Sequence, residues 1–303
     1  MRIATFNVQN LRLRHPGGED RLDGARDGDM AEDAALDPVD RRLTAAVIRD
    51  LRADVVALQE VFDSQTLDHF HDRVLVASGV APYPYRVCLP GNDGRGLDVA
   101  VMSRVPLGAV ASHAGLRAAD LGLDAPEREL DQPVFRRDCL MVEVGRLTLF
   151  ICHFKAPGPD AAASWPVRRR EAEAVRRIVE ARFADPAGAL WLIAGDLNDP
   201  DPAGMPGRAI APLGARFTVN LTRRMPRGER WTLHDPSSGR RFLPDAFLAS
   251  PALAAGWPEA VPKVVREGLA REAGPGRRLP QVGTHRPRAS DHAALVVDFP
   301  GLQ

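Results

Sequence analysis

The sequence contains little cysteine and almost no lysine. Cys88, Cys139 and Cys152 are odd in number and have no spacing typical of a metal site, so we expect buried thiols in a reducing compartment. Arginine supplies nearly all of the positive charge, and the only lysines are Lys155 and Lys263. Because Lys155 falls inside a polar motif, it becomes a candidate functional residue.

An excess of charge of one sign and a long apolar run are also absent. The 40 Lys and Arg residues balance the 40 Asp and Glu residues, so the net charge indicates no partner. No apolar stretch is long enough to span a membrane, and Met1 is followed by a strand-like segment rather than by a signal peptide. We therefore predict a cytoplasmic protein without a membrane segment.

Five short polar motifs adjoin apolar, strand-like stretches. They are Thr5-Phe6-Asn7, Leu58-Gln59-Glu60, His153-Phe154-Lys155, Gly195-Asp196-Leu197-Asn198 and Ser290-Asp291-His292. Carboxylates hold hard cations through oxygen, while histidines and a further carboxylate move protons. Together the motifs predict a metal-dependent site that cleaves a phosphate ester.

The acidic motifs suit two different tasks. Glu60 ends a buried strand, where its charge needs a partner such as Mg²⁺, although a surface glutamate would look the same in sequence. Asp196 and Asn198 are two residues apart and share a face if the backbone stays extended. Asp196 then takes a proton from water while Asn198 orients the water or the phosphate; an Asx-type turn is the alternative.

The histidines are candidates for contact with the phosphate. Asp291 would face the metal and His292 the phosphate, with Asp245 fixing the tautomer and positive charge of His292. The alternative is a polar cap at the start of a strand. His153 and Lys155 lie on one side of their strand and suit a phosphate or a leaving oxygen, unless His153 is only a core histidine.

Short apolar runs predict an α/β protein in which strands and helices mix without a strict βαβ repeat. This pattern favours sheets packed face to face with helices outside, and a site drawing on both termini makes residues 1–303 a single domain. The predicted helices are Val39–Leu51, Ser64–Ser78 and Trp165–Phe183. The predicted strands are Arg2–Val8, Asp54–Leu58, Tyr85–Leu89, Leu97–Met102, Cys139–Val144, Leu147–His153, Leu190–Ala194, Asp245–Ala249 and Ala293–Phe299.

Two regions are predicted to be irregular. Residues 15–38, rich in Gly and Asp, are expected to form a mobile loop near the site, either solvated and acidic or binding calcium. Residues 201–303 contain 15 Lys and Arg against 9 Asp and Glu, with most of the basic residues in 223–241 and 263–288. These basic loops either grip a nucleic-acid backbone or are simply solvated.

The set of motifs resembles the endonuclease/exonuclease/phosphatase superfamily over nearly the whole chain. Two further stretches, Arg95–Arg104 and Phe135–Asp138, look like the family's central strand with its Ser-Arg turn and the basic stretch before its next strand. The resemblance implies a four-layered α/β sandwich of the deoxyribonuclease I type, with two packed mixed sheets flanked by helices.

The resemblance also implies roles for individual residues. Glu60 would be the principal ligand of Mg²⁺, or of Mn²⁺ as a substitute, with Asn7 and Asp291 completing or adjoining the site. Asp196 would activate water, and His292, oriented by Asp245, would stabilise the transition state. His153 and Asn198 would assist the leaving group and position the phosphate, and Arg137 and Lys155 are candidate phosphate contacts.

At several positions the sequence departs from the motifs of individual branches of this superfamily, and these departures narrow the choice of substrate class. Asp199-Pro200 and Asp245-Ala246 disfavour the inositol polyphosphate 5-phosphatases, and Pro244–Phe247 fits abasic-site endonucleases poorly. A membrane-seeking hairpin typical of sphingomyelinases is absent. The sequence therefore favours a nuclease. A phosphatase or phosphodiesterase acting on a small molecule or lipid head group, and a non-catalytic relative, remain alternatives.

Overall fold

Two six-stranded mixed sheets form the centre of the computed structural model, which describes residues 1–27, 31–199, 206–214 and 216–303. The first sheet has the strand order β15 (Lys263–Val265), β16 (Ala294–Asp298), β1 (Arg2–Leu11), β4 (Val55–Val61), β6 (Asp98–Ser103) and β5 (Tyr85–Cys88). The second has the order β11 (Val219–Asn220), β14 (Asp245–Ala249), β10 (Trp191–Asp196), β9 (Leu147–His153), β8 (Cys139–Val144) and β7 (Leu107–Ala111).

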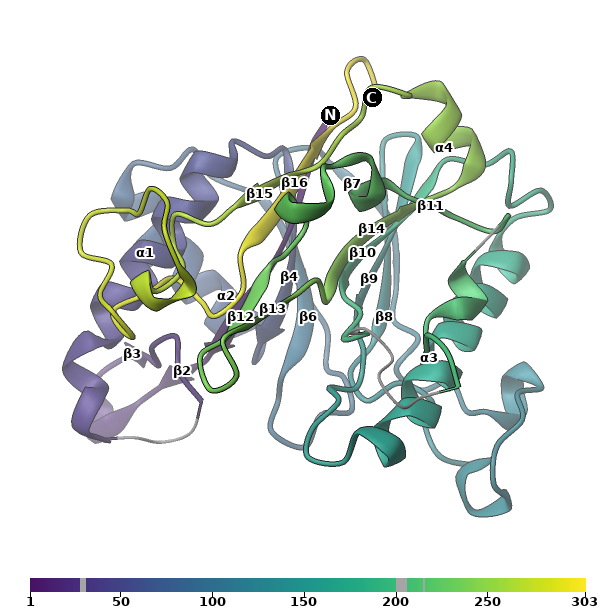
Figure 1. The fold of residues 1–303 in the computed structure, drawn as a ribbon, viewed down its shortest axis with the longest axis horizontal. Coiled ribbons are helices and arrows are strands. Elements are labelled where there is room, and N and C mark those ends of the chain that lie inside the picture. Colours follow the sequence, from purple (N-terminus) through teal and green to yellow (C-terminus); the bar gives the residue numbers. More distant parts are fainter. Residues whose placement is uncertain (28–30, 200–205, 215) are drawn as a thin grey trace.

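Helices cover the outer faces of both sheets (Figure 1). Helix α1 (Asp37–Leu51) and helix α2 (Ser64–Phe70) pack on the first sheet, and helix α3 (Ala161–Arg182) packs on the second. A short helix, α4 (Pro251–Gly256), follows β14, and the hairpins β2 (Leu13–Arg14) with β3 (Arg21–Leu22) and β12 (Leu233–Asp235) with β13 (Arg240–Phe242) complete the regular elements. The predicted four-layered α/β sandwich is confirmed.

Alternation along each strand divides the core into layers. In β1, Ile3 points between the sheets, whereas Ala4 and Phe6 point towards α1 and α2. In β9, Leu149 and Ile151 point between the sheets, and Phe150 and Cys152 point towards α3. Strands with two buried faces explain why the sequence shows nearly continuous apolar runs rather than alternation.

The strand directions bring the polar motifs to one end of the sandwich. Strand β1 runs parallel to β4, and β9 runs parallel to β10, so their carboxyl ends lie at the same edge of each sheet. Strands β14 and β16 run antiparallel to these neighbours and therefore begin where the neighbours end. Asn7, Glu60, His153 and Asp196 thus meet Asp245 and His292.

Several elements differ from the sequence prediction. Helix α3 begins at Ala161 rather than Trp165, because the side chain of Asp160 accepts hydrogen bonds from the amides of Ala162 and Ala163 and caps the first turn. The segment predicted as helix Ser64–Ser78 continues α2 as a π-helical turn and a 3₁₀ turn. The prediction missed α4 and the short strands β2, β3, β7, β11, β12, β13 and β15, which are two to six residues long and too short to show a clear period.

The predicted loop 15–38 is more ordered than expected. Residues 22–26 are buried, and the carboxylates of Asp23, Asp37 and Asp40 pair with arginines, chiefly Arg14, Arg26 and Arg286. These carboxylates are therefore neither solvated nor available to calcium, and α1 begins within the predicted loop, at Asp37. Residues 28–30 of the loop lie outside the described part of the chain. None of the helices within the described residues has the length and apolar character that a membrane span requires.

Candidate active site

Asp196 lies at the centre of the polar cluster formed by the strand ends. Its side chain is almost completely buried, and its register partners are His153 on β9 and Asp245 on β14. The Oδ2 atom of Asp196 lies 3.6 Å from Nε2 of His153 and 3.8 Å from Nε2 of His292. The carboxylate predicted to activate water is thus flanked by both predicted histidines.

The backbone around Asp196 is shaped to hold its carboxylate. Gly195 has φ 144°, and a Cβ atom there would lie 1.9 Å from the carbonyl oxygen of Cys152, so only glycine fits. Asn198 has φ 48°, and its amide N–H donates to Oδ1 of Asp196 at 2.9 Å. The Nδ2 of Asn198 donates to the carbonyl of Phe154, so Asn198 holds both Asp196 and the end of β9.

His292 is held from behind by Asp245. Oδ2 of Asp245 lies 2.9 Å from Nδ1 of His292 and also accepts a hydrogen bond of 2.6 Å from the hydroxyl of Thr232. Burial alone would lower the pKa of His292, but the charge and hydrogen bond of Asp245, with the charges of Asp196 and Asp291, raise it well above its usual value. The predicted pairing of Asp245 with His292 is therefore present, and His292 is a cation at neutral pH.

His153 and Asp196 show the opposite effects of burial. The pKa of His153 is lowered well below its usual value by burial and by the nearby charges of Arg137, His292 and Arg95, so its ring is neutral. Burial, together with the charges of Asp245 and Glu60, raises the pKa of Asp196 to about 7, although His292 opposes the shift. A carboxyl group with such a pKa can exchange a proton with water near neutral pH.

Glu60 forms a second acidic group beside Asp196. Its carboxylate accepts hydrogen bonds from Nδ2 of Asn7 at 3.1 Å and from the amide of Asn10 at 3.0 Å. Burial and the charge of Asp291 raise the pKa of Glu60. This carboxylate has neutral donors but no bonded cation among the described residues, so a divalent ion would relieve both the burial and the repulsion from Asp291.

Two sets of residues offer ligands to a metal. Asp196, Asp245 and His292 place one ligand atom each within 4.8 Å of one another. In this group, however, Nδ1 of His292 is bonded to Asp245, and the raised pKa of His292 disfavours the neutral imidazole that a metal requires. The carboxylates of Glu60 and Asp291 accept hydrogen bonds from neutral groups only, and neither forms an ion pair in the described residues. They therefore fit a hard cation better.

Asn7 joins the two acidic groups through its amide nitrogen. The Nδ2 atom donates to Glu60 and, at 3.2 Å, to Oδ2 of Asp196, while Oδ1 accepts from the amide of Gln9. Because a backbone N–H can only donate, Oδ1 must face Gln9 and the NH₂ group must face the carboxylates. In this orientation Asn7 holds the carboxylates of Glu60 and Asp196 through one amide group.

Arg137 and Lys155, the two predicted phosphate contacts, bond to other parts of the protein. Arg137 is buried, with its Nε 3.0 Å from Oδ2 of Asp93, and its charge acts on His153. The ammonium group of Lys155 donates to the carbonyls of Ala156 and Gly158 in its own loop. Neither side chain is bonded to the Asp196 cluster in the described residues.

Sequence reasoning missed residues that support the site from behind. Thr232 anchors Asp245, and the hydroxyl of Ser290 donates to the carbonyl of Asn7 at 2.7 Å. Oε1 of Gln9 accepts from the amide of Asp291 and from Arg288. Only Ser290 lay within a predicted motif; Thr232 and Gln9 have no pattern that marks them.

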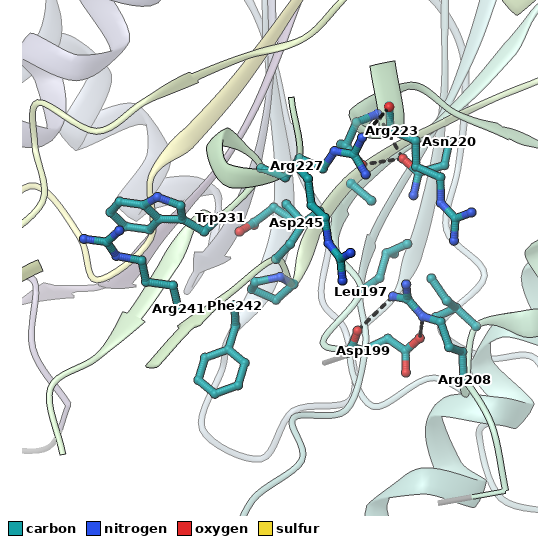
Figure 2. Close-up of a pocket in the computed structure, with 16 residues that line it drawn as sticks. Leu197, Asp199, Arg208, Asn220, Arg223, Arg227, Trp231, Arg241, Phe242 and Asp245 are labelled. Carbon is teal, nitrogen blue, oxygen red and sulfur yellow. Dashed lines mark hydrogen bonds and ion pairs between the residues drawn. The ribbon is translucent and has the colours of Figure 1, made fainter. Parts of the chain in front are cut away.

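An arginine-rich pocket of about 460 Å³ adjoins the site (Figure 2). Leu197 and Asp245 contribute to its wall, so the pocket begins directly beside the Asp196 cluster. Its arginines are Arg208, Arg223, Arg227, Arg230 and Arg241, and its carboxylates are Asp199 and Asp245. This pocket contains four of the six arginines of the predicted basic segment 223–241. In the other basic segment, 263–288, Arg271, Arg278 and Arg286 instead bond to the protein's own carbonyls or carboxylates.

The sequence matches the endonuclease/exonuclease/phosphatase family over residues 4–292. The chain belongs to this family. A comparison with curated proteins finds no match. Among solved structures, the chain is similar to an endonuclease/exonuclease/phosphatase from Beutenbergia cavernae, with 20% identity and a TM-score of 0.62, covering 98% of this chain and 70% of that one.

Two other structures show the same architecture. An AP endonuclease from Archaeoglobus fulgidus has 16% identity and a TM-score of 0.56, covering 99% of both chains. Danio rerio TDP2 complexed with a single-strand DNA product has 17% identity and a TM-score of 0.54, covering 98% of this chain and 97% of that one. At these sequence identities, the similarity to solved structures shows only a shared fold. The match over residues 4–292 is what assigns the chain to the family.

Proposed function

We propose that this protein is a metal-dependent phosphodiesterase that hydrolyses nucleic acid. The observation that carries the proposal is the buried Asp196 carboxylate, which lies between neutral His153 and protonated His292 and is bonded through Asn7 to Glu60. A potential base, a cationic group for the phosphate and a candidate metal ligand thus meet at one strand edge. The family match supports hydrolysis of a phosphate ester at this edge.

Glu60 and Asp291 would hold the cation, which we propose to be Mg²⁺ with Mn²⁺ as a substitute. Oxygen-only ligands suit these hard ions, and the raised pKa of Glu60 indicates negative charge in need of compensation. When bound, the ion would neutralise charge on the phosphate and make the phosphorus more open to attack. Asn7 fixes the positions of the Glu60 and Asp196 carboxylates by donating a hydrogen bond to each.

The remaining residues divide the proton transfers and the charge stabilisation. Asp196, with Oδ1 held by the amide of Asn198, accepts the proton of the attacking water at Oδ2. The Nε2–H of His292 donates to a phosphoryl oxygen as negative charge grows there, and Asp245 keeps the ring protonated. Neutral His153 lies on the other side of Asp196 and holds its orientation or donates a proton to the leaving oxygen.

Nucleic acid is favoured as substrate by the arginines beside the site. Phosphodiester backbones are bound chiefly by arginine and lysine, and the pocket that begins at Asp245 has five arginines against two carboxylates. The Danio rerio structure is described as a complex with a single-strand DNA product, which is consistent with this substrate class. The pocket's limited volume also suits a small phosphate ester, which is the second candidate substrate.

The deciding experiment measures cleavage of supercoiled plasmid and of labelled single-stranded DNA and RNA with Mg²⁺ or Mn²⁺. A panel of phosphomonoesters and choline phospholipids is assayed beside them. EDTA and Asp196→Asn should abolish cleavage, whereas Asp298→Asn, which removes an exposed aspartate at the opposite end of the sheet, should not. Turnover of a small ester alone would replace the nuclease proposal with the second candidate.

A further inference from the structure

Among the described residues, two guanidinium groups of the arginine-rich pocket have no bonded partner of any kind. Figure 2 shows Arg223 and Arg227 above Asp245 and Leu197, on the side of the pocket opposite Arg208 and Asp199. Arg223 belongs to the 3₁₀ turn Leu221–Arg224, and Arg227 to the 3₁₀ turn Arg227–Glu229. Both residues are exposed, and neither guanidinium has a hydrogen-bond or ion-pair partner in the part of the chain that the structure describes.

The other charged groups of the pocket are already bonded. Arg208 pairs with Asp199, with 2.8 Å between Nε and Oδ2. Arg230 donates to the carbonyls of Met225 and Arg223, and Arg241 donates to the carbonyl of Ala273. Asp245 is engaged by His292 and Thr232. Arg223 and Arg227 are therefore the arginines of the pocket whose donors are free among the described residues, and an anion of the substrate would supply the missing partner.

The size and lining of the pocket restrict that ligand. A volume of about 460 Å³ lies within the range of small-molecule sites, so a single nucleotide unit fits inside and a double helix does not. Half-buried Phe242 and Trp231 line the same pocket and offer an apolar surface to a sugar or base. Arg241 and Arg266 lie over the Trp231 ring, whereas Arg240 alone lies over the Phe242 ring, so Phe242 has fewer arginines stacked against it.

The basic surface continues beyond the pocket. Trp231 and Arg241 also line a neighbouring hollow of about 300 Å³, whose other arginines are Arg266, Arg277 and Arg278. A substrate with one isolated phosphate would use neither Arg223 and Arg227 nor this hollow. A chain with a phosphate at each unit would use both.

We propose that Arg223 and Arg227 bind the phosphate next to the scissile one in an unpaired nucleic-acid strand, with the intervening nucleotide in the pocket against Phe242. This subsite rests on the proposed function, because it needs a scissile phosphodiester at Asp196. It makes Arg223 and Arg227 specificity-determining residues that bind substrate without taking part in the proton transfers. The preferred substrate is a strand with at least two successive phosphates.

Dinucleotides provide a direct test. A deoxydinucleotide with a single phosphodiester is compared with the same dinucleotide carrying an added terminal phosphate at its 5′ or its 3′ end. The wild type is compared with Arg223→Gln/Arg227→Gln and with the control pair Arg52→Gln/Arg146→Gln. The control pair removes the same charge from exposed positions at the opposite end of the sheets. Unchanged thermal unfolding verifies that each variant is folded.

One terminal phosphate should raise kcat/KM of the wild type and the control pair about tenfold or more, as a charge-assisted arginine contact would. The double variant should lose that gain, so that its kcat/KM is about the same for the phosphorylated and the unphosphorylated dinucleotides. For a longer single strand, the slope of log KM against log salt concentration should become smaller by about 0.7, the value for one lost phosphate contact. An equal gain in the double variant, or no gain for either phosphorylated dinucleotide, overturns the subsite.

A binding measurement separates this inference from the proposed function. Calorimetry in EDTA measures the affinity of the phosphorylated dinucleotide without any cleavage. If the wild type cleaves no nucleic acid yet binds this ligand more tightly than the double variant does, the proposed nuclease activity fails and the subsite stands. If the wild type cleaves nucleic acid but both proteins bind the dinucleotide equally, the subsite fails and the proposed function stands.

Discussion

Asp245 and His292 form a bonded pair, with 2.9 Å between Oδ2 and Nδ1, although Asp245 begins β14 and His292 precedes β16, which belongs to the other sheet. The pair fixes the Nε2 atom of His292 on the side of Asp196. Burial lowers the pKa of His292, but the charge and hydrogen bond of Asp245, together with the charges of Asp196 and Asp291, raise it overall, so Asp245 favours the protonated ring. The hydrogen bond between Asp245 and His292 thus links the two sheets and also favours the positive charge on His292.

We therefore predict that Asp245→Asn leaves His292 neutral at neutral pH. Without the carboxylate, burial dominates and the pKa of His292 falls, so the alkaline limb of the pH–rate profile moves to lower pH. The expected loss of kcat at neutral pH is about 100-fold, the size of a lost charge-stabilising contact. Thr232→Val, which removes only the 2.6 Å bond to Asp245, should shift the same limb less. An unchanged limb in Asp245→Asn would assign the alkaline pKa to another group.

Cation binding is predicted to depend on Glu60 and Asp291. Glu60→Gln and Asp291→Asn should each weaken Mn²⁺ binding about 100-fold, measured by calorimetry or electron paramagnetic resonance, because each removes a proposed ligand. Glu143→Gln changes a carboxylate at the far end of β8 and serves as the control. If Asp245→Asn weakened binding more than Glu60→Gln did, the cation would belong instead to the group of Asp196, Asp245 and His292.

The acid limb of the activity is predicted to follow Asp196. Burial raises the pKa of this carboxyl group to about 7, and only its ionised form can accept a proton from water. Activity should therefore be present at higher pH and fall about tenfold per pH unit below the folded-state pKa. A bound cation favours the ionised form, so the midpoint should lie at or below about 7 and move down as Mg²⁺ is added. A midpoint that does not respond to Mg²⁺ would separate Asp196 from the metal site.

The apolar strands and the residues at their ends could be predicted from sequence, because buried runs and polar motifs are local patterns. Strand β8 and strand β9 were predicted with their observed bounds. The distortions of the backbone were not predictable. Gln9, Asn10 and Glu60 all have positive φ, and the register between β1 and β4 shifts there. These bulges turn the amide of Asn10 towards Glu60, and they arise from contacts between distant segments.

Side-chain direction explains where the site prediction was incomplete. Lys155 was expected to share a side with His153, but β9 ends at His153 and the following loop lets the ammonium group bond to its own carbonyls. Arg137 was expected at a surface or a phosphate and is instead buried against Asp93. Two residues of spacing determine a face only while the strand continues, and no local pattern reveals which carboxylate an arginine will meet.

Gly195 is predicted to tolerate no side chain. Gly195→Ala would place a Cβ atom 1.9 Å from the carbonyl oxygen of Cys152 in a backbone conformation with φ 144°. Because the clash is with backbone in the centre of a sheet, we expect a loss of about 3 kcal/mol or more in the free energy of unfolding, measured with urea. Gly228→Ala, at a position with open space, is the matched control. A small loss of unfolding free energy in Gly195→Ala would mean that β9 and β10 can separate locally.

Arg41 is predicted to hold the distorted end of β1 in place. Its wholly buried guanidinium donates to the carbonyls of Val8, Gln9 and Asn10 and to two carbonyls of the loop at residues 23–24. Burial lowers its pKa to about 10, which leaves the group charged at neutral pH.

Arg41→Met should therefore leave these carbonyls without their donor and remove a positive charge near Asp40. We expect a loss of about 3 to 5 kcal/mol in the free energy of unfolding, because several buried carbonyl oxygens lose their bonds to a charged donor at once. Arg42→Met, on the exposed face of the same helix, should change it by less than about 0.5 kcal/mol. In the folded fraction of Arg41→Met, Mn²⁺ should also bind more weakly, because the amide of Asn10 no longer stays aligned with Glu60. Wild-type Mn²⁺ affinity in that variant would show that the end of β1 keeps its shape without the arginine.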